Sequence, residues 1–461
     1  LGYIGLGASW IAISMVRFGG VVLPLAAVLT FVIAVFLSSY IALCGYLLRR
    51  YFSELSTKIQ ALLVFPALWG LTEWLRGWLF TGNPWLSLAY SQTDGWLSGF
   101  IPIMGVFGVG FLVCVISSLL YFLVLEIINI KNRSVTEKKP AIIYFFSIVT
   151  LVLTSYLFQW VEWVEKDGEK IKVSLLQGNI PQDKKWKPEY RRLTIERYLE
   201  MTRANWESQI IIWPETALPM YFHQAKNLLT NLAGEAEKHG ASVLIGLPVL
   251  NEKDKAIYYN SMVSLPGKFQ FYHKNHLVPF GEYVPLKYLF GGLIQFMNIP
   301  MADFSQGGSD QPLLRAAGYA IGISICFEDA FGEDVIRGLP EASLLVNVSN
   351  DAWFGDSFAP HQHLQIARYR AIESGRPMLR ATNNGISALV DNRGKIIKLS
   401  KQFSEEVVTD YVQPMTGSTP YVIWGNYPIV SGLSLLLLFF GVRSRRMGSC
   451  TAKNSRTRGH L

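Results

Sequence analysis

Long runs without a charged side chain recur along the chain, separated by short charged segments. Four such runs cover residues 21–48, 97–125, 141–161 and 421–442. Each is long enough to cross the hydrocarbon core of a bilayer as a helix, which takes about 20 residues. Core helices of a soluble protein do not need this repeated pattern, so the runs predict a multi-span α-helical membrane bundle.

Two further stretches extend that prediction. Residues 59–80 form an apolar run interrupted by Glu73 and Arg76, which share a helix face. Charges at such a depth are functional candidates, so this pair is interpreted either as a structural ion pair or as a contact for a phospholipid headgroup. Residues 1–16 are apolar with no basic segment before them. We interpret them as part of a further span and not as a signal peptide.

Between residues 170 and 415 the pattern changes to short β-branched runs that alternate with amphipathic stretches. The expected strands are residues 173–176, 210–213, 243–246, 321–325 and 344–348. The expected helices are residues 188–206, 224–239 and 361–374. Such alternation is typical of one α/β domain. The expected organisation is a helical membrane bundle (1–169), a catalytic domain (170–415), a closing span (421–442) and a basic tail (443–461).

Basic residues are concentrated in three of the connecting segments. The loops at 49–58 and 129–140 each carry more Lys and Arg than acids, and the tail after residue 442 carries six basic residues and no acid. The segment 81–96 has only Asp94. By the positive-inside rule the three basic segments are cytoplasmic, and alternate crossing then puts the domain at 170–415 on the extracytoplasmic face.

Composition and charge exclude several classes of protein. Half of the 461 residues are hydrophobic, which excludes a disordered chain, and four cysteines are too few for a disulfide scaffold. The net charge of +8 comes mostly from the short tail, while the domain at 170–415 is close to neutral. We therefore expect a membrane partner and no nucleic-acid partner. No dimerisation pattern is visible, and a monomer is expected.

One cysteine follows a predicted buried strand of the α/β domain. Cys326 is the only cysteine between residues 170 and 415, so it has no disulfide partner within the domain. It is either a small buried apolar residue or a nucleophile presented at a strand end, where α/β folds place catalytic groups. A nucleophilic thiol needs a base or a cation nearby.

Candidates for those roles occur upstream. Glu215 follows the predicted strand at 210–213, and Lys274 and Glu282 flank a Pro-Phe-Gly segment. Singly, each has an ordinary interpretation as a solvated turn or surface residue. Together with Cys326 they supply a base, a cation and a thiol.

These residues stand in strings that resemble a known superfamily. Trp213-Pro-Glu215, Lys274-Asn-His-Leu-Val-Pro-Phe-Gly-Glu282 and Ile325-Cys326-Phe-Glu328 resemble the Glu-Lys-Cys triad of the carbon–nitrogen hydrolase (nitrilase) superfamily. Other strings resemble the bacterial apolipoprotein N-acyltransferase family: Gln177-Gly-Asn-Ile-Pro-Gln182, Ser349-Asn-Asp-Ala-Trp-Phe-Gly355, Arg380-Ala-Thr-Asn-Asn-Gly385, Thr72-Glu-Trp-Leu-Arg-Gly77 and Gly82-Asn-Pro-Trp85. The resemblance covers essentially the whole chain. It implies an αββα sandwich beside the membrane bundle.

The sequence departs from that family in two respects. About eight spans are usual and six are counted here, so we expect that the first two spans are missing from this sequence. The residue after the nucleophile is often Tyr in the family and is Phe327 here. A role for that hydroxyl is therefore in question, while the backbone N–H is unaffected.

The resemblance implies an acyltransferase of the bacterial inner membrane with no cofactor. It would move a fatty acyl chain from a phospholipid to the α-amine of a diacylglyceryl-cysteine apolipoprotein. By the same resemblance, Glu215 is the general base, Cys326 forms a thioester, and Lys274 stabilises the oxyanion together with the N–H near Phe327.

Two carboxylates are expected to support these groups. The resemblance implies that Glu282 orients Lys274 or the substrate amine, and that Glu328 holds the loop around Cys326. A second interpretation pairs Glu328 with one of the arginines near residues 368–380.

A transferase must exclude water and admit lipid. The uncharged apolar stretch at 289–301 fits a lid that dips into the bilayer surface, or alternatively a core helix of the domain. The residues expected to contact lipid are Phe290, Leu293, Phe296, Met297, Trp186 and Trp353. For Trp186, a plain packing role is an equal alternative.

Two rival functions remain at this point. One is a membrane-anchored nitrilase or amidase that uses the same triad with water, and the other is a catalytically silent membrane scaffold. The apolar stretch and the membrane spans favour the transferase over the amidase, and the complete triad disfavours the scaffold. The histidines at 273, 276, 361 and 363 do not match a zinc spacing, so no metal is expected.

Overall fold

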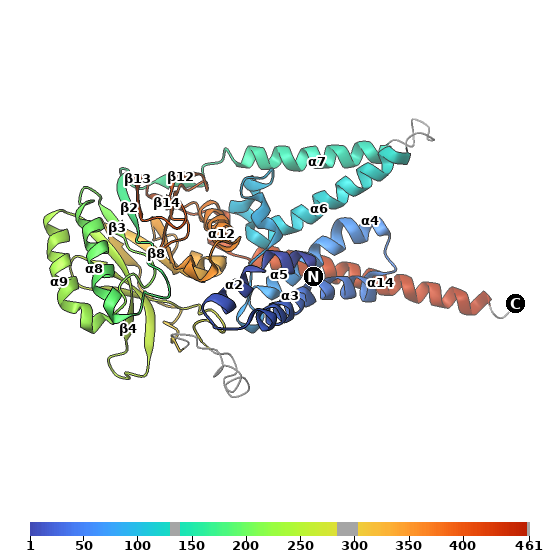
Figure 1. Cartoon of the computed structure of the whole chain (residues 1–461). Coiled ribbons are helices and arrows are strands. Elements are labelled where there is room, and N and C mark those ends of the chain that lie inside the picture. The colour runs from blue at the N-terminus through green and yellow to red at the C-terminus, as the bar shows by residue number, and fades with distance from the viewer. Residues whose placement is uncertain (130–138, 284–302, 459–461) are drawn as a thin grey trace. The chain divides into compact units, whose positions relative to one another are not determined.

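The computed structural model describes residues 1–129, 139–283 and 303–458 (Figure 1). The chain divides into two compact units. The helical unit comprises Leu1, Ile33–Glu162 and Ile423–Leu461, and the α/β unit comprises Gly2–Val32 and Trp163–Val422. The α/β unit therefore takes in a segment from the start of the chain.

Four helices are long and apolar enough to cross a membrane, by length and composition. They are Leu23–Phe52 (helix α3), Ser98–Ile128 (the short η4, Ser98–Phe100, continued by α6, Ile101–Asn129), Pro140–Phe158 (within α7, Lys139–Phe158) and Tyr427–Met447 (within α14, Tyr427–Arg458). All four uncharged runs of the sequence thus form the predicted membrane helices. The last begins later than expected, because a separate short helix, α13 (Pro420–Trp424), precedes it.

The fifth apolar run is helical but irregular. It consists of α4 (Thr57–Ile59), the π-helical turn η1 (Gln60–Val64) and α5 (Phe65–Arg76). Pro66 stands in the first turn of α5 and has no N–H to continue the α-helical ladder, which accounts for the break at this point. Within the helical unit α5 packs against α6 and α14.

Glu73 and Arg76 end this helix as a buried pair. Their charged groups lie 3.8 Å apart. The Arg76 guanidinium also donates to the carbonyls of Asn83 at 2.8 Å and Trp85 at 2.5 Å. A buried guanidinium needs such acceptors. The pair therefore forms the structural ion pair that was the first of the two interpretations. Short 3₁₀ helices, η2 (Leu79–Thr81) and η3 (Leu88–Gln92), follow it.

The first 16 residues do not form one span. They fold as two short helices, α1 (Gly2–Gly7) and α2 (Trp10–Arg17), each far shorter than the ~20 residues that a membrane crossing takes. Contacts with the α/β unit outweigh the apolar pattern here. Trp10 packs edge-on against Phe354 with ring centroids 4.7 Å apart, and its indole N–H donates to Gln362 at 3.1 Å.

Two six-stranded sheets form the centre of the α/β unit. The first sheet, in spatial order, is β13 (Glu406–Val412), β2 (Ile171–Gln177), β3 (Ile210–Ile212), β4 (Ser242–Leu250), β5 (Tyr258–Leu265) and β6 (Gln270–His273). The second sheet is β12 (Ile396–Leu399), β11 (Ala388–Val390), β10 (Met378–Thr382), β9 (Leu344–Ser349), β8 (Tyr319–Ile325) and β7 (Leu314–Ala316). A small ribbon pairs β1 (Val164–Lys166) with β14 (Met415–Gly417).

Each sheet has a parallel centre and antiparallel edges. β2, β3 and β4 run parallel, as do β8, β9 and β10, while the outer strands pair antiparallel. All five strands expected from the sequence are present. The parallel centres matter for function, because the residues that follow parallel strands emerge at one edge of a sheet.

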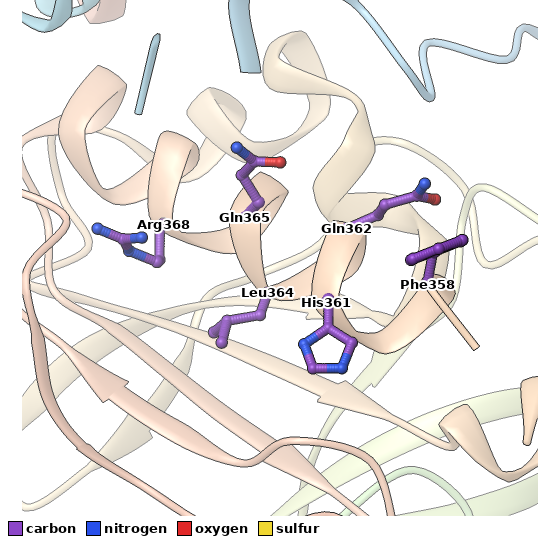
Figure 2. Close-up of a pocket in the computed structure, with 6 residues that line it drawn as sticks. All are labelled: Phe358, His361, Gln362, Leu364, Gln365 and Arg368. Carbon is purple, nitrogen blue, oxygen red and sulfur yellow. The ribbon is translucent and has the colours of Figure 1, made fainter. Parts of the chain in front are cut away.

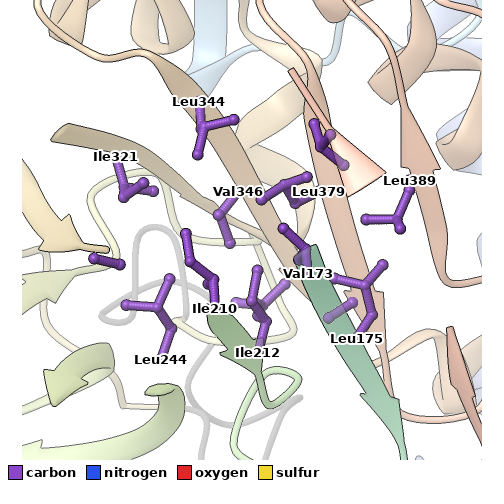
Figure 3. Packing of buried hydrophobic residues seen from close by; sticks show 14 of the residues in the cluster. Val173, Leu175, Ile210, Ile212, Leu244, Ile321, Leu344, Val346, Leu379 and Leu389 are labelled. Atoms are coloured by element: carbon purple, nitrogen blue, oxygen red, sulfur yellow. The ribbon is translucent and has the colours of Figure 1, made fainter. Parts of the chain in front are cut away.

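The two sheets pack face to face through alternate residues of their strands (Figure 3). On β3, Ile210 and Ile212 point into the space between the sheets, and Ile211 points outward. Strand periodicity requires this alternation, and each fully buried Ile or Leu contributes about 1.5–3 kcal/mol. The inner layer is therefore a dry apolar core that fixes the strand ends.

Helices cover the outer face of each sheet. α8 (Pro188–Arg203) and α9 (Phe222–Lys238) pack on the first sheet, and α12 (Ala359–Ser374) packs on the second. The layers are thus helix, sheet, sheet and helix, which is the sandwich that the resemblance implied. The remaining short helices are η7 (Cys326–Ala330), α11 (Gly332–Val335), η8 (Ile336–Gly338) and η9 (Asp351–Phe354).

Candidate active site

Glu215 lies in the turn that follows β3. Its side chain is 9% exposed, and its carboxylate accepts a hydrogen bond from the Asn260 amide at 2.7 Å. Gly246 of β4 lies beneath this turn, where a Cβ atom would come within 2.9 Å of the Glu215 Cα. The glycine therefore lets the turn approach the sheet closely and keeps Glu215 inside the domain.

Lys274 lies directly after β6 and is 1% exposed. Its ammonium donates to Glu282 at 2.8 Å and lies 3.7 Å from Glu215. The Asn260 amide also reaches Glu282, at 3.2 Å, so one amide joins both carboxylates. Burial lowers the pKa of Lys274, but the charges of Glu282 and Glu215 outweigh it and hold the pKa above its usual value. Lys274 is accordingly a fixed, charged ammonium.

Cys326 is the first residue of η7, immediately after β8, and it has a left-handed φ of 54°. A non-glycine residue in that region is strained and is held there by its surroundings. Burial raises the pKa of the Cys326 thiol, the nearby Glu215 charge raises it further, and Lys274 lowers it. Both charged groups therefore act on the pKa of this thiol, in opposite directions.

Glu328 joins the lysine segment to the cysteine segment. Its carboxylate accepts N–H groups of Asn275 at 2.7 Å, His276 at 2.9 Å and Ile325 at 2.7 Å. The Tyr272 hydroxyl donates to it at 3.0 Å. Burial raises the pKa of Glu328 to about 7.

These contacts decide between the two interpretations of Glu328. The arginines near residues 368–380 have other partners. Arg368 and Arg376 donate to backbone carbonyls, Arg370 pairs with Glu373, and Arg380 pairs with Asp351. Glu328 instead holds the two backbone segments that carry Lys274 and Cys326.

Phe327 and the tryptophans occupy less enclosed positions. The Phe327 ring meets Phe331 edge-on, with centroids 5.1 Å apart. Trp186 is half-buried in the segment between β2 and α8. Trp353, in η9, packs edge-on against Phe18 of the N-terminal segment at 5.2 Å. The other four residues expected to contact lipid, Phe290, Leu293, Phe296 and Met297, lie outside the described residues.

Sequence reasoning missed two buried polar residues beside Glu215. Asn260 is an interior residue of β5, and nothing in the local pattern marks it. Lys185 is 1% exposed and donates to the backbone carbonyl of Glu215 at 3.1 Å. Burial lowers the pKa of Lys185 to about 8, opposed by the charge of Glu215. Its position in an otherwise charged loop made it look like a surface residue.

One cleft of the α/β unit contains none of these residues in its lining. This cleft, of about 220 Å³, runs along the exposed side of α12 (Figure 2). It is lined by Phe358, His361, Gln362, Leu364, Gln365 and Arg368. Among the residues that the structure describes, no group of three or more His, Cys, Asp or Glu side chains is arranged to hold a metal ion.

A two-sheet sandwich with an acid, a lysine and a cysteine at its strand ends is the architecture of the carbon–nitrogen hydrolase class, and the sequence model of the carbon-nitrogen hydrolase family matches residues 172–421. A second model, the apolipoprotein N-acyltransferase N-terminal domain, matches residues 1–119. The chain belongs to the apolipoprotein N-acyltransferase family, and it is therefore an acyltransferase.

Curated relatives agree over nearly the full length. The chain is 44% identical to the apolipoprotein N-acyltransferase of Methylococcus capsulatus over 97% of this chain and 87% of the relative. It is 40% identical to that of Nitrosomonas europaea over 95% and 86%, and 38% identical to that of Vibrio cholerae over 97% and 87%.

Solved structures of the nitrilase superfamily are similar at low identity. A carbon-nitrogen hydrolase from Helicobacter pylori is 16% identical, with a TM-score of 0.39, over 60% of this chain and 96% of that one. Nit3 of Saccharomyces cerevisiae is 16% identical, with a TM-score of 0.38, over 55% and 93%.

Proposed function

We propose that this protein transfers a fatty acyl chain from a membrane phospholipid, through a thioester on Cys326, to the N-terminal α-amine of a diacylglyceryl-cysteine apolipoprotein. The observation that carries the proposal is the buried ammonium of Lys274 between two carboxylates, 2.8 Å from Glu282 and 3.7 Å from Glu215, beside a thiol on a strained turn. The names of the relatives supply the acceptor, and the membrane helices supply access to the donor.

In the first half-reaction Glu215 takes the thiol proton as Cys326 attacks the ester carbonyl. The oxyanion is stabilised by Lys274 and by the backbone N–H of Phe327. The tetrahedral intermediate collapses, the ester C–O bond breaks, and Glu215 returns the proton to the departing lysophospholipid oxygen. Burial and the Glu215 charge keep the thiol protonated at rest, so a base is needed in this step.

In the second half-reaction the acceptor amine takes the place of the lysophospholipid. Glu215 accepts its proton as the nitrogen attacks the thioester, an amide bond forms, and the C–S bond breaks. Cys326 then regains its proton from Glu215. A covalent intermediate between two substrates predicts ping-pong kinetics. Glu282 and Glu328 hold Lys274 and the cysteine turn in place throughout.

Six aromatic or apolar side chains are proposed to contact the lipid. Trp186 and Trp353 are proposed to cover the acyl chain, together with Phe290, Leu293, Phe296 and Met297 of the stretch at 289–301. Trp353 already packs on Phe18, so it would contact the acyl chain through the part of the indole that Phe18 does not cover.

The test is to trap the intermediate. Purified protein is incubated with phospholipid alone and its intact mass is measured; we expect one added acyl chain, and no addition in Cys326→Ala. An unmodified thiol after prolonged incubation would falsify the covalent route. Adding a diacylglyceryl-cysteine peptide should discharge the acyl group onto its amine. If free fatty acid is released without the peptide as fast as the acyl group is transferred with it, the protein is instead a hydrolase.

We also propose that the α/β unit lies outside the cytoplasm of an inner membrane. The support is the distribution of basic residues, which are concentrated in the segments 49–58 and 129–140 and in the tail. A thiol reagent that cannot cross membranes should label Cys326 in intact spheroplasts. Labelling that appears only after lysis would reverse the proposed orientation.

A further inference from the structure

A cluster of charged side chains is buried behind the turn that carries Cys326. Its members come from four different elements and are at most 1% exposed: Asp329 of η7, Asp351 of η9, His363 of α12 and Arg380 of β10. None of them belongs to the Glu-Lys-Cys set. Burying so many charges is costly unless each is paired, so the cluster needs a reason to exist.

Both ring nitrogens of His363 face oxygen atoms. When the two acids are ionised, all of these oxygens accept hydrogen bonds and none can donate one. Nε2 lies 3.0 Å from the Asp329 carboxylate and 3.1 Å from the backbone carbonyl of Cys326. Nδ1 lies 3.2 Å from the Asp351 carboxylate. A neutral imidazole has one N–H and would set a lone pair against an acceptor, whereas an imidazolium donates from both nitrogens.

The charge balance leads to the same protonation state. Arg380 lies 2.9 Å from Asp351 and 3.6 Å from Asp329, so one guanidinium faces two carboxylates. A protonated His363 makes the buried cluster neutral. Burial and the Arg380 charge lower the pKa of His363, but the two carboxylates outweigh them and the net direction is upward. The Arg380 charge holds the pKa of Asp351 below its usual range against the effect of burial.

The contact with Cys326 has a consequence for the next peptide group. The Cys326 carbonyl accepts from His363 and also from the Asn347 amide at 3.1 Å. The peptide unit is planar and trans, so the N–H of Phe327 points opposite to that carbonyl. Two donors that hold the carbonyl on the cluster side therefore turn this N–H away from the cluster.

We propose that His363, as an imidazolium, is a positioning residue for acyl transfer: by holding the Cys326 carbonyl it aims the Phe327 N–H at the oxyanion of the ester. This inference rests on the proposed function, in which that N–H stabilises the oxyanion. His363 does not touch the substrate. When His363 loses its proton, the carbonyl loses its charged donor. The groups that face the ring are Asp329, Asp351 and Arg380.

The experiment compares two reactions of the same thiol. Acylation by phospholipid passes through an oxyanion, and alkylation by iodoacetamide does not. His363→Gln should slow acylation by about 10-fold or more, approaching the ~10²–10³-fold loss seen when an oxyanion donor is removed. Alkylation should stay within about 2-fold, because displacement at carbon leaves no oxyanion for that donor to stabilise. His361→Gln, at an exposed position of the same helix, is the matched control and should leave both rates unchanged.

The pH dependence separates positioning from plain structural support. In the unsubstituted protein the ratio of acylation rate to alkylation rate should fall as the pH rises through the ionisation of His363. Iodoacetamide reacts with the thiolate, so alkylation rises with pH in both proteins and lowers the ratio in both. The fall should be steeper in the unsubstituted protein than in His363→Gln, where the ratio is low from the start. If His363→Gln does not fold, His363→Asn, which also carries an uncharged amide donor, takes its place in the same comparison.

The outcomes are distinguishable. Equal acylation rates in His363→Gln and the unsubstituted protein, or a ratio that falls with pH equally steeply in both, would overturn the role of His363 and leave the thioester route intact. An unsubstituted protein that is alkylated at Cys326 but never acylated would overturn the proposed function itself. If acylation and alkylation slow equally in a folded His363→Gln, His363 supports the reactivity of the Cys326 thiol and not the oxyanion. That result would also overturn the positioning role.

Discussion

Replacing Glu282 by Gln removes one of the two carboxylates around Lys274 while keeping the shape of the side chain. At an effective dielectric constant of about 20, charges 2.8 Å and 3.7 Å apart attract by roughly 6 and 4.5 kcal/mol respectively. Breaking a buried ion pair costs about 3–5 kcal/mol. Since Glu215 still faces the ammonium, we expect a smaller loss, about 2–3 kcal/mol of unfolding free energy.

Glu282→Gln should also slow acyl-enzyme formation, and by more than the loss of unfolding free energy alone would suggest. Without Glu282, the Lys274 ammonium is drawn toward Glu215, so it leaves the oxyanion position and pairs with the base that must take the thiol proton. We expect acyl-enzyme formation to slow by ~10²-fold, the order seen when one oxyanion donor is lost. Intact-mass measurements over time give this rate, and thermal unfolding in detergent gives the stability.

The control is Glu252→Gln in the loop between β4 and β5, which removes the same charge at an exposed position. It should match the unsubstituted protein in both assays. A Glu282→Gln variant that acylates and unfolds like Glu252→Gln would refute the view that two carboxylates hold Lys274 in place.

Two further substitutions probe buried cations with different surroundings. Lys185→Met should slow acylation about 10-fold, because the Glu215 carbonyl loses a charged donor worth about 1.5–3 kcal/mol. It should not lower the unfolding temperature at pH 7. Folding lowers the pKa of Lys185 from 10.5 to about 8, so the free-energy cost of burying the ammonium is complete below pH 8 and fades as the pH rises toward 10.5. Thermal unfolding scans across that pH range measure this cost. Arg76→Met should sharply reduce the yield of monodisperse protein in detergent, because the carbonyls of Asn83 and Trp85 lose their donor and the Glu73 carboxylate loses the charge it pairs with. A normal yield would refute this structural role of Arg76.

Local patterns were sufficient for much of the architecture. Charge-free runs predicted the four membrane helices, and β-branched runs predicted the central strands, because hydrophobic burial acts on each segment through its own periodicity. The same reasoning did not predict the two short helices at residues 1–16. The apolar pattern there is real, but Trp10 and Phe18, at the two ends of α2, pack on Phe354 and Trp353 of the α/β unit.

Residue type and position relative to a strand also indicated the chemistry. A lone cysteine and a glutamate that each follow a predicted strand can be recognised from the chain alone, and the parallel centres of the sheets bring such strand ends to an edge. Lys274 follows β6, which is not among the predicted strands, and was recognised through the string in which it stands. Their roles as nucleophile, cation and base stay proposals, to be tested by trapping the acyl-enzyme.

The partners of these residues were decided only in three dimensions. Asn260 joins Glu215 to Glu282 because the antiparallel register of β4 and β5 brings it there, and no local pattern records that register. His363 reaches the Cys326 carbonyl across 37 positions of the chain, because α12 packs on the second sheet. Burial sets which ionised form each group keeps, and burial is a property of the packed layers, whereas the sequence specifies only which groups are available to be buried.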